Sequence, residues 1–348
     1  MLDNLDFLAA RLHGRRSQMA EGERLDALCR VRIMPQLASL LLSGAETESA
    51  AQLQRRLVED LAKEVTRIAA QLSPAGAQVL GWLAVRFQVE NLKVVVRGIA
   101  TGIPPELWQP HLLALPREIA LDTEAMAASK SVGELVRLLA TGPLRKGLAE
   151  AVELLDKASR PFYFEAALDR GYFEQLLAHA EALTGEDKAL VRPMVLQEID
   201  TYHLMLVARG RFSHRLEAEA LLPMHVSGTG IPRERLAAML ADADLRTAAS
   251  RGLGRALDSL PSGEGGEASN AMAPADLEAL AWKRFLRLAH RAFRRSHMGL
   301  AAVVAYVEMR RVEVANLVTL SEAIRTQLPE EQLRARLIPR RSVEAAYV

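Results

Sequence analysis

One short pattern occurs three times in the sequence, at nearly equal spacing. Asn91, His203 and Asn316 align in it, at successive offsets of 112 and 113, and each is followed by Leu. Three such periods nearly fill the 348 residues, which indicates three homologous domains. The three segments are FQVENLKVVVRG (87–98), QEIDTYHLMLVARG (197–210) and VEVANLVTLSEA (312–323).

The residues around these segments predict helices. Leu57, Leu61 and Val65 recur at the spacing of one helix face, and a helix and a break precede each segment. The breaks fall at Ser73-Pro74, at Thr184-Gly185 and at 297–299. No alternation typical of strands is sustained. We therefore predict an all-α fold with domains at 1–115, 116–225 and 226–348.

Polar residues recur inside the pattern as well. Gln88, Asp200 and Glu313 stand three residues before the aligned positions. We interpret the amides of Asn91 and Asn316 as side chains that bond a neighbouring helix or turn, in preference to partner contacts.

Two Arg-Gly pairs, Arg97-Gly98 and Arg209-Gly210, close the first two segments, whereas the third has Glu322 in place of Arg. The pairs predict helix ends, with the cation in the last turn and glycine free to adopt a left-handed conformation. An intrachain salt bridge is the other structural role that we expect for each arginine.

Composition excludes several classes of protein. The formal net charge of +1 argues against a nucleic-acid binder. The single cysteine, Cys29, argues against a disulfide framework and fits a reducing cytoplasm. No signal peptide and no transmembrane segment are expected, and no glycine-rich phosphate loop is present. A Gly- and Ser-rich stretch over 261–274 predicts a surface loop.

A metal site at Asp200 and His203 is an alternative to a purely structural role. Their spacing of three residues is used in di-iron helical bundles. Such a site needs a second acid-x-x-His pair, and no other histidine in the sequence has an acid three residues before it. A structural histidine is therefore favoured, and no catalytic residue, metal or cofactor is expected.

A cleanly segregated basic face is predicted for residues 281–295. Lys283, Arg284, Arg287, Arg291, Arg294 and Arg295 fall on one side of a helix, and Phe285, Leu288, Ala289, Ala292 and Phe293 fall on the other. An ordinary solvated surface would explain this pattern. Contact with an acidic protein surface or with anionic lipid headgroups would explain it as well.

The chain resembles the C subunit of archaeal and bacterial V-type ATPases, whose family includes the d subunit of the eukaryotic vacuolar enzyme. FEAALDRGYFEQLL (164–177) and the EIDTYHLMLVARG segment carry the resemblance in the middle of the chain. ARLHGRRSQM (10–19) and VENLKVVVRG extend it towards the N-terminus, and AYVEMRRVEVANL (305–317) with LPEEQLRARL extends it towards the C-terminus.

The resemblance implies a funnel-like arrangement of three helical domains related by a pseudo-threefold axis. It also implies a non-catalytic rotor subunit on the cytoplasmic side of the membrane. This subunit would join the central stalk to the membrane proteolipid ring in ATP-linked transport of protons or sodium ions. A generic helical-repeat scaffold for other protein partners is the alternative.

Overall fold

A computed structural model describes residues 5–42, 49–154, 160–254 and 272–339. Within these ranges the chain forms seventeen α-helices and no strand, so the predicted all-helical class is confirmed. The loop predicted over 261–274 lies outside the described residues, except for its last three positions. Of these, Pro274 is already the first residue of a helix.

Six long helices make up the centre of the molecule. They follow one another in three pairs, and the predicted breaks separate the two helices of each pair. Proline occupies the first turn of three of the six, because its missing N–H is not needed there. The pairs are α4 (Ala50–Ala69) with α5 (Pro74–Thr101), α10 (Pro161–Ala182) with α11 (Gly185–Met205), and α15 (Pro274–Ser296) with α16 (Leu300–Arg325).

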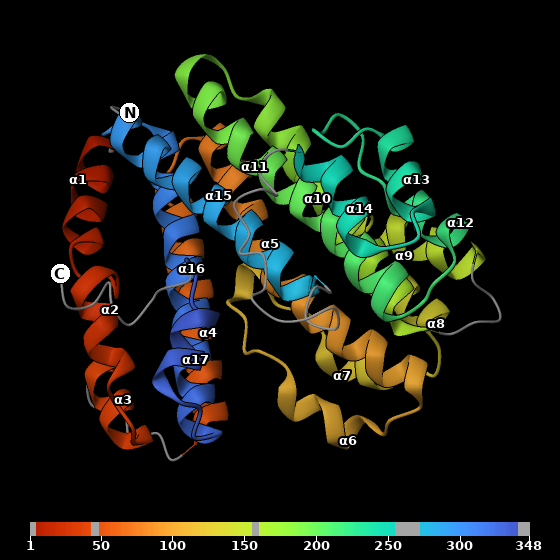
Figure 1. Cartoon of the computed structure of the whole chain (residues 1–348), viewed down its shortest axis with the longest axis horizontal. Helices are drawn as coiled ribbons and strands as arrows, with labels where there is room; N and C mark the ends of the chain where they lie inside the picture. The colour runs from red at the N-terminus through yellow and green to blue at the C-terminus, as the bar shows by residue number, and fades with distance from the viewer. Residues whose placement is uncertain (1–4, 43–48, 155–159, 255–271, 340–348) are drawn as a thin grey trace.

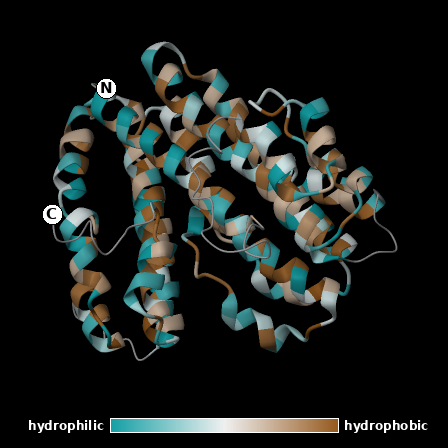
Figure 2. Ribbon diagram, in the orientation of Figure 1, coloured by the Kyte–Doolittle hydropathy of each residue, from teal (hydrophilic) through white to brown (hydrophobic). Residues whose placement is uncertain are grey.

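Each long helix buries apolar side chains. In α4 the predicted stripe that contains Leu57, Leu61 and Val65 is buried. Val95 and Val96 are buried inside α5, so this β-branched run is part of a helix. Figure 2 shows hydrophobic and hydrophilic residues alternating along the helices, as expected where one face meets the core. No helix of the described part is long and apolar enough to cross a membrane.

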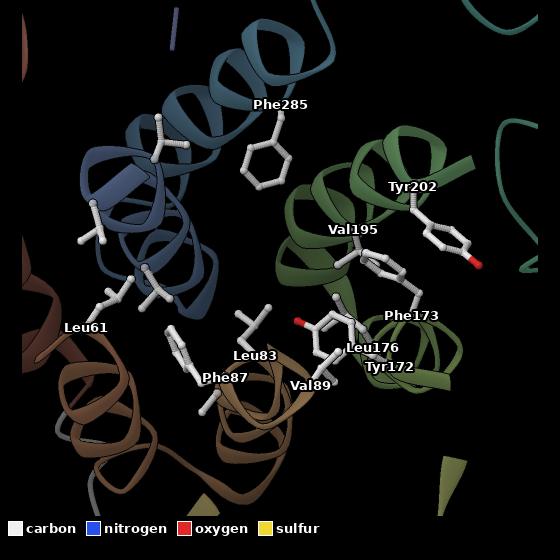
Figure 3. Packing of buried hydrophobic residues seen from close by; sticks show 14 of the residues in the cluster. Leu61, Leu83, Phe87, Val89, Tyr172, Phe173, Leu176, Val195, Tyr202 and Phe285 are labelled. Atoms are coloured by element: carbon white, nitrogen blue, oxygen red, sulfur yellow. The ribbon is translucent and has the colours of Figure 1, made fainter. Parts of the chain in front are cut away.

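The six long helices pack in a closed circuit. Within each pair the two helices pack against each other, and α5 packs on α10, α11 on α15, and α16 on α4. Their apolar side chains share one interior, to which Leu61, Phe87, Tyr172, Val195 and Phe285 belong (Figure 3). Each fully buried side chain of this size contributes roughly 1.5–3 kcal/mol through removal of apolar surface from water.

Shorter helices connect and flank the long ones. In Figure 1, α1 to α3 lie along one side of the molecule and α12 to α14 lie towards the opposite side. Their bounds are α1 Leu5–Arg16, α2 Gly22–Cys29, α3 Met34–Leu41, α6 Pro105–Trp108, α7 Thr123–Ala127, α8 Val132–Leu138, α9 Pro143–Leu154, α12 Ala218–Leu221, α13 Arg233–Ala241, α14 Leu245–Leu253 and α17 Glu330–Arg336. A π-helical segment, η3 (Leu206–Ser213), continues α11, and the short 3-10 turns are η1 Gln109–His111, η2 Arg117–Ile119 and η4 Leu222–Met224.

An ionic network joins the second helices of the three pairs. Arg86 of α5 donates a hydrogen bond to Glu198 of α11. Arg311 of α16 lies 2.8 Å from the same Glu198 carboxylate, and its other nitrogen lies 3.1 Å from Glu308. Arg86, Glu198 and Arg311 are separated in the chain by the same two intervals as Asn91, His203 and Asn316.

Aromatic rings line this network. The guanidinium of Arg86 lies 5.0 Å from the ring centre of Tyr172, and that of Arg311 lies 5.1 Å from the ring centre of Trp282. Glu308 is buried, and the loss of hydration raises its pKa to about 7. The network therefore holds α5, α11 and α16 together in surroundings of low polarity.

We predict that Glu308→Gln makes the protein less sensitive to alkaline pH. The pKa of Glu308 is higher in the folded chain than in the unfolded chain. The stability that its protonated form contributes is therefore complete below about pH 4.5 and is lost as the pH rises through 7. The neutral amide avoids this loss, so the variant should be more stable than the wild type at pH 8 and nearly equal to it at pH 4.5. Urea unfolding at both pH values measures the difference, and parallel pH profiles would contradict the prediction.

Candidate functional site

The aligned residues of the repeat form hydrogen bonds with the backbone of the segment that follows the second helix of each pair. The amide of Asn91 donates to the carbonyl of Leu113 at 3.0 Å and accepts from its N–H at 2.8 Å. Asn316 makes the same pair of bonds with Ile338, both at 2.8 Å and again 22 residues downstream.

His203 has a related contact in the middle of the chain. Its Nε2 accepts from the N–H of Val226 at 3.0 Å, 23 residues downstream. Burial, aided by neighbouring His225, lowers the pKa of His203 to about 3, so the imidazole is neutral and able to accept this bond. The rings of His203 and His225 stack with their centres 4.8 Å apart.

Gln88, Asp200 and Glu313 stand three positions before these aligned residues. Two of the three also form a hydrogen bond with the backbone of the segment that follows their helix. Gln88 donates to the carbonyl of Ile119 at 3.0 Å, and Asp200 accepts from the N–H of Ile231 at 3.1 Å; both partners lie 31 residues downstream. Glu313 differs, because it accepts from the N–H of Ala20, near the N-terminus, at 2.5 Å.

These bonds also bear on the metal alternative. Asp200 Oδ1 and His203 Nε2 both accept from backbone N–H groups, so these lone pairs face the chain and not a common ligand. Within the described ranges, no group of three or more His, Cys, Asp or Glu residues could hold a metal ion.

Arg97 and Arg209 pair with the first helix of the following helix pair. Arg97 lies 2.9 Å from Glu165 of α10, and Arg209 lies 2.5 Å from Glu278 of α15. Glu165 and Glu278 are separated by one period of the repeat, so the two bridges recur with the sequence. Glu322 instead pairs with Arg325 of its own helix at 2.5 Å.

The predicted helix ends at the two Arg-Gly pairs are wrong. Helix α5 continues past Gly98 to Thr101, and the left-handed residue is Gly102, with φ of 68°. Gly210 lies inside η3. A Cβ at Gly98 would lie 2.3 Å from the Trp108 ring, and one at Gly210 would lie 2.9 Å from the Phe162 ring. These glycines therefore allow close packing of neighbouring side chains and do not end helices.

The basic face of α15 is the main unpaired feature of the predicted site. Phe285, Ala289, Ala292 and Phe293 are buried, and Leu288 is half-buried. The six cations lie on the exposed side and make no ion pair or hydrogen bond with any residue in the described ranges; they are Lys283, Arg284, Arg287, Arg291, Arg294 and Arg295. Most other long helices carry ion pairs on their exposed surfaces, such as Arg56–Asp60 of α4 at 2.9 Å. This face is the candidate site for a partner.

The ionic network of Arg86, Glu198 and Arg311 was not predicted from the sequence. The signal was available, since these three residues stand at equivalent positions, five residues before Asn91, His203 and Asn316. An alignment of the three segments that looks only for identical or similar residues does not detect this set, because Glu198 carries the opposite charge to Arg86 and Arg311.

We predict that Gly98→Ala destabilises the protein, whereas Gly81→Ala in the same helix does not. The methyl group at position 98 must displace the buried Trp108 ring, which should cost about 1–3 kcal/mol. Nothing lies within 4 Å of a Cβ at Gly81, so alanine there should stabilise the helix by up to about 1 kcal/mol. Thermal and urea unfolding of both variants provide the measurement. Equal effects at the two positions would refute the packing role of Gly98.

Comparison with known proteins identifies the family. The chain is 24% identical to the C subunit of the A-type ATP synthase of Methanocaldococcus jannaschii, over 95% of this chain and 86% of that protein. It is 23% identical to the C subunit of the A-type ATP synthase of Thermococcus kodakarensis, over 93% of this chain and 88% of that protein. The model of the family described as ATP synthase (C/AC39) subunit matches residues 8–336. A match over nearly the whole chain establishes that this all-helical protein belongs to the ATP synthase C/AC39 subunit family.

Proposed function

We propose that this chain is a non-catalytic rotor subunit of a rotary V/A-type ATPase. In this role it joins the central stalk to the membrane proteolipid ring and couples ATP turnover to proton or sodium transport. It works on the cytoplasmic side of the membrane, as a peripheral part of the complex. The observation that carries the proposal is the family match over residues 8–336.

The proposal includes the predicted arrangement of three homologous domains, 1–115, 116–225 and 226–348, around a pseudo-threefold axis in a funnel. Three kinds of repeated contact support it. Side-chain bonds reach 22, 23 and 22 residues downstream in the three units. Salt bridges from Arg97 and Arg209 each reach the next helix pair, and the long helices pack in a closed circuit.

Stiffness is the physical requirement for a part that passes torque. A closed circuit of helices resists twisting better than an open row, because no end is free to swing. The buried network of Arg86, Glu198 and Arg311 adds to this, since separating these helices would leave charges unpaired in an apolar interior. Both features support a mechanical role.

The exposed cations of α15 are the proposed contact with neighbouring subunits. Arg287, Arg291, Arg294 and Arg295 make no ion pair or hydrogen bond with the described residues, and the charge of Arg284 interacts only at longer range, with Asp200. A generic scaffold would have no particular need for such a face. The helical fold by itself would suit a scaffold as well as a rotor subunit.

We predict that membranes from cells that lack this chain lose ATP-driven ion uptake. Adding the purified protein back should restore most of the uptake, and the tagged protein should co-purify with proteolipid and stalk subunits. Dye-quenching of ion uptake and ATP hydrolysis, measured on the same membranes, test the coupling. Unimpaired uptake without the chain, or co-purification only with unrelated proteins, would favour the scaffold.

A further inference from the structure

We infer that a charged pocket beside α16 binds a small anion that carries two or more phosphate groups. The pocket lies between α4 and the N-terminal segment, residues 5–42, and residues of α16 form its third wall. The inference goes beyond the proposed function and does not depend on it, because binding of such an anion is a property of this chain alone.

The walls of the pocket meet at α16. Helix α4 packs on α16, and so do α1 and α3 of the N-terminal segment (Figure 1). The cavity between them has a volume of about 610 Å³, which lies within the usual range of sites for small molecules. Four arginines contribute to its lining, namely Arg15 of α1, Arg24 of α2, Arg67 of α4 and Arg310 of α16.

The acids of the pocket already pair with cations. Glu64 lies 2.6 Å from Arg15 and 3.3 Å from Arg310. Glu313 pairs with Arg310 as well. Asp60 pairs with two cations of α4 that do not line the pocket. None of these three acids is therefore left to neutralise the remaining arginines.

Arg24 and Arg67 are these remaining cations. Arg24 donates to the backbone carbonyl of Gln18, and the Nε of Arg67 donates to that of Lys63 at 3.1 Å. Neither arginine forms an ion pair with an acid of the described ranges, and both are exposed. They belong to different walls, so two guanidinium groups border the cavity from separate helices. A cleft lined by charge of one sign concentrates the opposite ion more than an open surface does.

The fold does not require these charges. Arg310 and Leu317 stand two periods of the repeat after Val85 and Leu92 of α5. Val85 and Leu92 line a pocket of about 380 Å³, so a cavity recurs at the same place in the repeat. In that second pocket Asp122 is the one charged residue among mainly apolar ones. The arginines therefore belong to the pocket beside α16 in particular and need a reason other than the shared fold.

Phosphate groups match this lining. A guanidinium group can hold two phosphate oxygens at once through parallel N–H donors. Arginines on two walls suit an anion with more than one phosphate. Among the described residues that line the pocket, Tyr306 is the only aromatic one, and its hydroxyl donates to Glu64 at 2.8 Å. The lining thus favours phosphate groups over a nucleotide base.

The first test measures the binding of pyrophosphate to the purified full-length chain by calorimetry, at about 0.1 M salt, where charge interactions reach about 10 Å. The wild type should bind one equivalent. The variant R24Q/R67Q should bind at least about tenfold more weakly, because two charge-assisted contacts are lost. Its fold should persist, since both side chains bond only backbone carbonyls, and thermal unfolding without the anion checks this.

The matched control is R291Q/R294Q, which removes two exposed arginines from the basic face of α15. It should bind pyrophosphate as the wild type does. Equal weakening in both double variants would show that any exposed arginines attract the anion, and it would overturn the inference. Absence of binding to the wild type would overturn it too.

The second test locates the anion without any substitution. Leu57 and Leu317 line the pocket, so their methyl NMR signals should shift when pyrophosphate is added. The methyl signals of Leu288 in α15 should stay in place. Shifts at Leu288 but not at Leu57 and Leu317 would place the anion on the basic face and contradict the inference.

A third measurement compares ATP with tripolyphosphate. ATP should bind no more tightly, because the lining favours phosphate groups over a base. An affinity for ATP more than about tenfold higher would show that the base is recognised, and the assignment to phosphate groups alone would fall. All three measurements use this chain by itself, so their outcome is independent of whether it assembles with ATPase subunits.

Discussion

The fold depends on the point where α5, α11 and α16 meet. Two arginines and a glutamate from equivalent positions of the repeat lie together there, with Glu308 beside them. Charges in such surroundings are costly unless they stay paired, so any rearrangement that separates the three helices is strongly opposed. The apolar interior supplies most of the stability, and the network restricts how the six helices can be arranged around it.

The bonds outside this centre follow from the same arrangement. Once the second helices are fixed, Asn91, His203 and Asn316 face the chain that returns past them, and each bonds its backbone. Buried backbone groups need partners, and these side chains supply them where the returning segment is not helical. Arg97 and Arg209 then join one helix pair to the next. Polar residues of the repeat thus serve the assembly of the chain itself.

The basic face of α15 stands apart from this pattern. Elsewhere the signature residues find hydrogen-bond or ion-pair partners within the chain, but the α15 arginines make no such bond with the described residues. In a protein whose acids and bases nearly cancel, a stripe of unpaired cations needs another explanation than net charge. The contact with a neighbouring subunit proposed above would provide it. The stripe was predictable from sequence because it depends only on the helical period.

The sequence by itself determined the helices, their breaks, the equal spacing of the repeat and the segregation of α15. These features depend on neighbours within a few residues, and local periodicity records such neighbours. Only the tertiary structure decided what Gly98 does and which partners Arg86 and Arg97 have. The residues that they meet, Trp108, Glu198 and Glu165, lie far beyond the next helical turn in the chain. Glycine beside arginine is an equally good signal for a helix end and for close packing, and the approach of the Trp108 ring decides between them.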